Sequence, residues 1–196
     1  MANTDRPSGL KPVGHLNGGP WNGKARMYYI DVTNTPAIFK GDAVVSAGSS
    51  DASGKYASIN QAAVSENIRG VVVGFSDQPY IAVDTSDTNR AYCPATTEMY
   101  ALVVDDPDVI FEVQEDNDGG DIDADMIGLC TNIVATAGST SSGISGMELD
   151  SDGTAADAYG QLKILGVSNK EDNALGTNCK FDVLIIEHEL RSSTGV

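Results

Sequence analysis

The chain has 196 residues, ordinary apolar content and a net charge of −16. This length suits one large domain or two small ones. No stretch approaches the roughly 20 apolar residues that span a bilayer, and the first residues lack the apolar run of a signal peptide. We therefore expect folding in a cytoplasm. The acidic balance argues against nucleic acid and anionic membranes as partners, since both need clustered Lys and Arg.

Residues 1–25 predict an extended arm, because prolines and glycines interrupt any helical or strand period. The arm is basic: Arg6, Lys11, Lys24 and Arg26 against Asp5 alone give residues 1–26 a net charge of +3, which leaves −19 for the rest. Trp21 is the only tryptophan of the chain. It is either an anchor for a partner or a packing residue of its own domain, and the pattern leaves both open.

From residue 26 onward the sequence changes to short runs rich in Val, Ile, Tyr and Phe, bounded by turn-forming residues. Several runs alternate apolar and polar residues, which is typical of half-buried strands. The expected strands lie within residues 26–32, 36–47, 54–59, 68–75, 80–83, 98–104, 108–115, 162–167 and 180–190.

Only two short stretches have helical character, residues 58–68 and 121–129. The prediction is therefore an all-β fold, either a β-sandwich or a barrel, with a jelly roll among the options and one or two short helices. We expect a single β-rich domain over residues 26–190. Small residues dominate 136–160 and predict a long surface loop. The last residues, 191–196, are expected to form a flexible C-terminus.

The acidic stretch EDNDGGDIDAD, residues 115–125, resembles a calcium-binding loop. An EF-hand needs oxygen ligands at alternate positions, Gly at position 6 and Glu at position 12. Starting at Asp121 places Met126 at position 6, and starting at Asp116 places Gly120 at position 5, so both registers fail. The preferred interpretation is a tight turn followed by a helical turn capped by Asp121. Calcium binding of another kind stays open.

The sequence predicts no catalytic residue, no metal ligand and no cofactor site. His188 lies in EHEL rather than in an HExxH zinc motif, and a surface position is expected for it. Phosphate-binding glycine motifs and a GxSxG elbow are absent from the sequence. The three cysteines, Cys93, Cys130 and Cys179, are widely spaced, which predicts buried, reduced thiols.

The chain resembles a group of tailed-bacteriophage virion proteins known as capsid cement or decoration proteins. The resemblance extends from about residue 6 to residue 189. It rests on RPSGLKPVGHLNGGPWNG, FKGDAVV, IRGVVVGF, YALVVDDPDVIFEVQEDNDGG, SGMELDS and KEDNALGTNCKFDVLIIEHE. It implies a β-rich protein on the outer surface of an expanded capsid, assembled in the host cytoplasm. The implied partner is the phage major capsid protein, with a homo-oligomer bound over the junctions between capsomers, a trimer being favoured over a dimer.

The basic arm fits this role, because an extended segment can bury much surface on a neighbour and tie together several partners. The predicted partner-binding residues comprise four cations and three apolar anchors: Arg6, Leu10, Lys11, Val13, Trp21, Lys24 and Arg26. The alternative is a virion head or tail attachment protein that binds host-surface glycans through its acidic loops, with calcium as a candidate ligand. A β-sandwich hydrolase with an unmarked carboxylate pair is a third, weaker reading.

Overall fold

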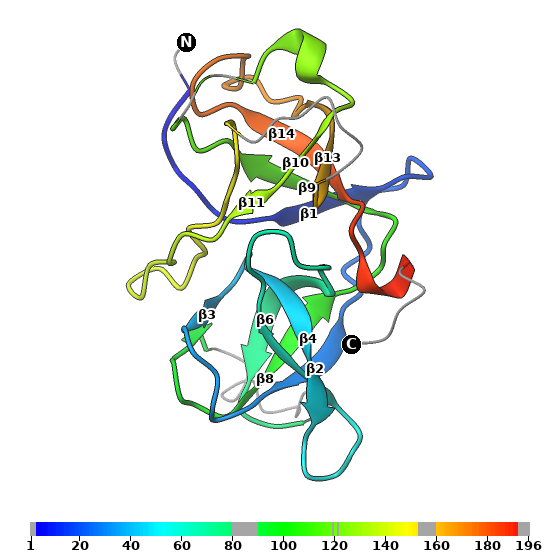
Figure 1. The fold of residues 1–196 in the computed structure, drawn as a ribbon, viewed down its shortest axis with the longest axis vertical. Helices are drawn as coiled ribbons and strands as arrows, with labels where there is room; N and C mark the ends of the chain where they lie inside the picture. Colours follow the sequence, from blue (N-terminus) through cyan, green and yellow to red (C-terminus); the bar gives the residue numbers. More distant parts are fainter. Residues whose placement is uncertain (1–2, 80–89, 119, 121, 153–159, 192–196) are drawn as a thin grey trace.

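Two β lobes are stacked along the long axis of the molecule in the computed structural model (Figure 1). The structure describes residues 3–79, 90–118, 120, 122–152 and 160–191. The upper lobe is built on a five-stranded sheet, and the lower lobe is a closed five-stranded barrel. The predicted all-β class is confirmed. Within the described ranges, no helix has the length and apolar character needed to cross a membrane.

The strands are short and come from all parts of the chain. They are β1 (Lys11–His15), β2 (Arg26–Ile30), β3 (Ile38–Phe39), β4 (Ala43–Ser50), β5 (Ala57–Gln61), β6 (Gly70–Ser76), β7 (Tyr92–Cys93), β8 (Met99–Val104), β9 (Val109–Gln114), β10 (Cys130–Thr131), β11 (Ile133–Val134), β12 (Glu148–Leu149), β13 (Leu162–Val167) and β14 (Lys180–Ile185). Two 3-10 turns, η1 (Ala124–Met126) and η2 (Glu189–Arg191), complete the set.

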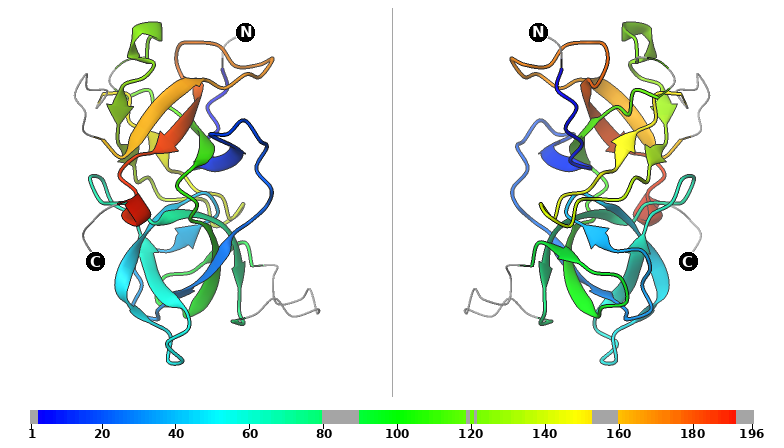
Figure 2. Two further views of the ribbon diagram at one scale, coloured as in Figure 1. Left: turned by 90° about the vertical axis from the view of Figure 1, so that its right-hand side faces the viewer. Right: turned by 90° about the vertical axis from the view of Figure 1, so that its left-hand side faces the viewer.

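The upper sheet has the order β1-β9-β14-β13-β10, and its neighbouring strands are antiparallel. Alternation along β9 and β14 turns Phe111, Val113, Phe181 and Val183 into the core, as the period-two pattern predicts. The N-terminal segment supplies β1 at one edge of this sheet, and β9 lies between β1 and the C-terminal strand β14. The side views in Figure 2 show this segment passing down one side of the molecule from the upper sheet to the barrel.

The barrel closes in the order β2-β5-β4-β6-β8, with one parallel contact between β2 and β5 at Tyr29 and Ser58. Its interior is filled by aliphatic and aromatic side chains, including Ile30, Ile59 and Phe75, all at most 1% exposed. Because β-branched and aromatic residues suit a pleated surface, the Val- and Ile-rich runs form these strands. Closure removes the open edges that isolated sheets present.

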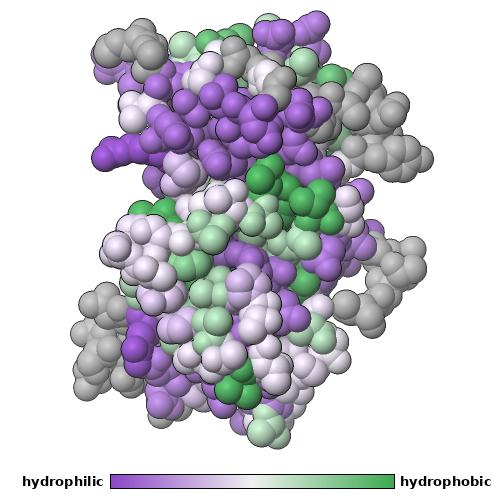
Figure 3. All heavy atoms as spheres, turned by 60° about the vertical axis from the view of Figure 1, so that its left-hand side comes forward, coloured by the Kyte–Doolittle hydropathy of each residue, from purple (hydrophilic) through white to green (hydrophobic). Residues whose placement is uncertain are grey.

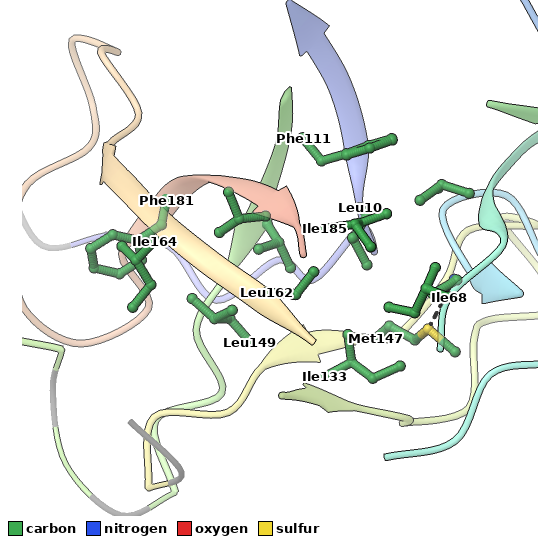
Figure 4. Packing of buried hydrophobic residues seen from close by; sticks show 14 of the residues in the cluster. Leu10, Ile68, Phe111, Ile133, Met147, Leu149, Leu162, Ile164, Phe181 and Ile185 are labelled. Carbon is green, nitrogen blue, oxygen red and sulfur yellow. Dashed lines mark hydrogen bonds between the residues drawn. The ribbon is translucent and has the colours of Figure 1, made fainter. Parts of the chain in front are cut away.

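The two lobes share a core at the waist, the zone where they meet. Residues from the barrel end, such as Ile68 and Val71, belong to the same buried cluster as Phe111 and Phe181 of the upper sheet. Figure 4 shows part of this cluster, with Met147 near Ile68 and Ile133. The Met147 sulfur accepts a hydrogen bond from the Ala43 amide at 3.2 Å. The lobes are thus packed together through continuous apolar contact.

Of the two predicted helical stretches, the first is wrong and the second is reduced to one 3-10 turn. Residues 57–61 form strand β5, and the remainder of 58–68 is irregular. The alanines and the polar residues of this stretch suggested a helix, but pairing with β4 and β2 closes the barrel and overrides that weak propensity. In the second stretch, the described residues 122–129 contain the short turn η1 and no longer helix. Asp123, not Asp121, stands at its N-cap and makes no side-chain capping bond.

The predicted loop at 136–160 contains core residues and a strand. Met147 and Leu149 are fully buried, and β12 pairs with β11. The stretch has few apolar residues from which a strand could be predicted, but two of them, Met147 and Leu149, lie in or next to β12. The expected strand at 80–83 lies outside the described residues, and so do residues 192–196 of the predicted flexible C-terminus.

The division between an arm at 1–25 and a domain at 26–190 needs correction. Residues 11–15 hydrogen-bond to β9 as a strand of the upper sheet, and Leu10 is only 1% exposed. Asn3 also binds backbone carbonyls at Ala174 and Thr177. The described part of the N-terminal segment is extended, yet it packs on its own chain because its apolar residues complete that chain's core.

Candidate interaction surface at the waist

An open, mainly apolar groove lies at the waist, where the N-terminal segment crosses from the upper sheet to the barrel. We call it the waist groove. Its volume is about 420 Å³, and it is lined by Ser8, Leu10, Lys11, Pro12, Trp21, Lys40, Gly41, Val72, Val73 and Ile144. Figure 3 shows apolar side chains gathered at the waist below the hydrophilic upper lobe.

Two glycines, Gly9 and Gly41, allow the backbone segments at the base of the groove to pack closely together. The Leu10 amide donates a hydrogen bond to the Gly41 carbonyl at 2.9 Å, and the Gly41 amide donates to Val72 at 2.7 Å. Gly9 and Gly41 both have positive φ, +65° and +97°, and a Cβ on Gly9 would come within 2.3 Å of the Gly41 oxygen. Only glycine permits this conformation together with such a close approach of two backbones.

A tight reversal after β1 brings Trp21 to the groove. The His15 amide donates to the Gly19 carbonyl at 2.8 Å, and the Trp21 amide reaches the Val13 carbonyl at 3.5 Å. The indole packs against the shared core, and its Nε1 is buried without a hydrogen-bond partner among the described residues. Trp21 therefore does pack on its own chain, and it also forms part of the groove wall.

Electrostatics distinguish the groove from the rest of this acidic chain. Lys11 and Lys40 are its charged lining residues, and no carboxylate lines it. Neither lysine forms an ion pair with any residue that the structure describes. By contrast, Arg26 lies 3.3 Å from the buried carboxylate of Asp105. The groove thus presents positive charge beside apolar surface.

The structure brings some of the predicted partner-binding residues together and separates others. Leu10, Lys11 and Trp21 line the groove, but Leu10 is a core residue rather than a free anchor. Val13 lies in the bulge of β1 and is 37% exposed. The remaining three cations are elsewhere. Arg6 borders a small cavity beside Asp172 and Lys180, and Lys24 and Arg26 border another beside Asp106.

Sequence reasoning did not assign the other seven lining residues to a site: Ser8, Pro12, Lys40, Gly41, Val72, Val73 and Ile144. Lys40 precedes the positive-φ Gly41 in FKGDAVV, so the turn was the only available signal. Val72 and Val73 read as ordinary strand residues in IRGVVVGF. Ile144, 42% exposed, lies in the stretch 136–160 that was predicted to be a surface loop. No local sequence pattern predicts that the segments containing Lys40, Val73 and Ile144 lie next to one another in the fold.

The acidic stretch contributes to a cluster rather than to an EF-hand. Carboxylate oxygens of Asp116, Asp118 and Asp150 lie within 4.8 Å of one another. Asp116 also accepts hydrogen bonds from the Ser151 amide and hydroxyl at 3.1 and 2.8 Å. The neighbouring Asp116 charge raises the pKa of Asp118. Converging carboxylates of this kind can hold a hard cation such as Ca²⁺.

His188 is buried, contrary to the predicted surface position. It is 2% exposed, and its Nδ1 accepts a hydrogen bond from the Leu190 amide at 3.1 Å. Burial lowers the pKa of this imidazole, and the charges of Arg191 and Arg69 lower it further. The chain turns from β14 into η2 at this point, so His188 fixes the end of the upper sheet against the barrel through its bridge with Ile68.

The cysteine prediction is confirmed. Cys93, Cys130 and Cys179 are free and buried. Burial raises the pKa of the Cys93 thiol to about 12, which keeps this sulfur protonated and unreactive.

No protein-family model, no curated protein and no solved structure matches this chain.

Proposed function

We propose that the chain is a structural virion protein of the capsid cement or decoration class. It binds the outer surface of the expanded capsid through the waist groove and stabilises contacts between capsomers. Its partner is the phage major capsid protein, and it acts as a homo-oligomer, with a trimer favoured.

One observation carries the proposal. Three stretches on which the resemblance to capsid cement proteins rests converge on the waist groove, although they are far apart in the sequence. RPSGLKPVGHLNGGPWNG supplies Leu10 and Trp21, FKGDAVV supplies Lys40, and IRGVVVGF supplies Val72 and Val73. Ile144 directly precedes a fourth stretch, SGMELDS. The shared sequence features and the candidate binding surface therefore coincide.

The proposed mechanism is stabilisation by mass action. A protein that binds only the assembled, expanded shell shifts the equilibrium toward that shell. A protomer that contacts two capsomers, or that is linked to sister copies, gains further from avidity. Surface complementarity is sufficient for this role, which needs no catalytic group.

Co-sedimentation with expanded coat-only capsids tests the proposal. The full chain is expected to bind saturably, with many copies per shell. Removal of the N-terminal segment is unsuitable, since β1 and Leu10 belong to the fold. The informative variant is Lys11→Glu with Lys40→Glu, expected to weaken binding about tenfold because two attractive charges become repulsive. The control is Lys55→Glu with Lys163→Glu, which reverses two exposed lysines outside the groove. Absence of saturable binding by the full chain would overturn the cement role.

A further inference from the structure

We infer that the waist groove receives an acidic peptide segment of the partner, which places an apolar side chain in the groove and carboxylates beside Lys11 and Lys40. This inference rests on the proposed function, because it gives the chemistry of the capsid element that the same surface would bind. It adds a ligand class that the cement role alone does not specify.

The lining of the groove fits an apolar side chain. Pro12, Trp21, Val73 and Ile144 present hydrocarbon or aromatic surface, and the fully buried Val72 lies beneath them. Ile144 is 42% exposed in the isolated chain, and Val13 beside the groove is 37% exposed. Burial of such surface is favourable by roughly 25 cal/mol per Å², so an occupant with an apolar side chain gains free energy here. The groove is open, which suits a peptide segment better than an enclosed small molecule.

Charge complementarity identifies the polar part of the occupant. Lys11 and Lys40 lack ion-pair partners in the described part of the chain, so both are available to an incoming carboxylate. Two unpaired ammonium groups beside apolar surface attract carboxylates. An apolar occupant would exclude water from the groove, and the attraction would then exceed that between fully solvated charges. A basic segment would meet repulsion from both lysines.

The net charge of the chain weighs against a second copy as the occupant of the groove, so the proposed homo-oligomer is expected to form through another surface. Each copy carries −16, so two copies repel each other at long range. A separate partner can instead present a local acidic segment without an equally large overall charge. The favoured occupant is therefore a segment of a different protein.

Trp21 is a built-in reporter for the experiment, because it lines the groove and is the only tryptophan of the chain. The purified full chain is titrated with a short acetylated peptide in which Asp alternates with Leu and Phe. The matched probe has Lys in place of each Asp. We expect a saturable change in Trp21 emission with the acidic peptide alone. The dissociation constant should rise about tenfold in the Lys11→Glu and Lys40→Glu double variant, and in high salt. It should be unchanged in the Lys55→Glu and Lys163→Glu control.

Three results would overturn the inference. They are no saturable response to the acidic peptide, equal binding of the basic peptide, and equal loss of affinity in the control variant. Concentration-dependent self-association that disappears in the Lys11→Glu and Lys40→Glu variant would assign the groove to a second copy and also refute it. The capsid assay separates this inference from the proposed function. Capsid binding without peptide binding refutes the inference alone, and peptide binding without capsid binding refutes the cement role alone.

Discussion

The pKa values of two carboxylates in this acidic protein, Glu112 and Glu148, are shifted in opposite directions by their surroundings. Glu112 is buried, and although burial opposes its ionisation, hydrogen bonds from Lys170 and Ser168 hold its pKa below the usual value. Among the residues that the structure describes, no cation forms an ion pair with Glu148. Its burial, together with the charges of Asp5 and Asp116, raises its pKa to about 7. A hydrogen bond from Gln114 at 3.5 Å compensates only weakly.

Glu148 therefore makes stability depend on pH. Its pKa is higher in the folded state than in the unfolded state, where it lies near 4.5. The folded state binds the proton more tightly, so this contribution is fully present below about pH 4.5 and is lost as the pH rises through about 7. Glu148→Gln should raise the free energy of unfolding by about 1 kcal/mol at pH 8 and leave it unchanged at pH 4, as measured by urea denaturation. Glu171→Gln, on an exposed side chain, is the control. A gain of equal size at both pH values would refute the argument.

At the scale of single elements, strands were predictable where the signal was local. The alternation in 108–115 and 180–190 corresponds to β9 and β14, because one face of each is buried in the shared core. The β12 strand was missed, since its two residues lie in a run of small residues and depend on pairing with β11. The β5 strand was predicted only in part, since the expected strand at 54–59 overlapped a stretch of helical character at 58–68. Its conformation is fixed by pairing with the preceding strand β4 and with β2, which lies further away in the sequence.

The candidate site was predictable only in part. Lys11 and Trp21 were identified from charge and from the rarity of tryptophan, and both line the groove. Lys40 and Ile144 were not, because their approach to the N-terminal segment depends on the Gly9 and Gly41 contact. Sequence patterns report the faces of an element but not which distant turn it meets.

That glycine contact anchors the N-terminal segment, and it can be tested with a matched pair of substitutions. Gly9→Ala combines an unfavourable φ of +65° with a Cβ only 2.3 Å from the Gly41 oxygen. Gly48→Ala has a similar φ of +70° but no atom within 4 Å. We expect losses of about 1 kcal/mol for Gly48→Ala and ~2–4 kcal/mol for Gly9→Ala, measured by denaturant unfolding. Equal losses would show that the close approach of the two backbones has no energetic weight.

At the scale of the whole molecule, the two lobes are joined through strands that they share and not only through connecting segments. Strands β6 and β8 contribute to both cores, since Val71 and Val104 lie in the shared waist cluster while Val72 and Val103 point into the barrel. On the opposite side of the waist from the N-terminal segment, η2 follows β14 onto the barrel (Figure 2). There the Glu189 carboxylate accepts hydrogen bonds from the Ser46 amide and hydroxyl, and it lies 3.6 Å from Arg69.

This sharing of strands predicts that the lobes unfold together. Val71 packs in the waist core and Val72 in the barrel core. Because the two residues are neighbours on one strand, unfolding of one core would disturb the other.

Phe181→Ala in the upper lobe and Phe75→Ala in the barrel each remove a fully buried ring and should cost ~3–5 kcal/mol. Scanning calorimetry should give one transition for the parent chain and for each variant. Each substitution should lower the midpoint of that transition by about 10 °C or more, with equal calorimetric and van't Hoff enthalpies. If the lobes were independent, Phe181→Ala would shift one of two transitions and leave the other in place. The proposed binding surface at the waist would then lie between two bodies free to move. A single cooperative unit instead keeps both walls of the waist groove at a fixed separation, which the proposed repeated contact on a capsid would require.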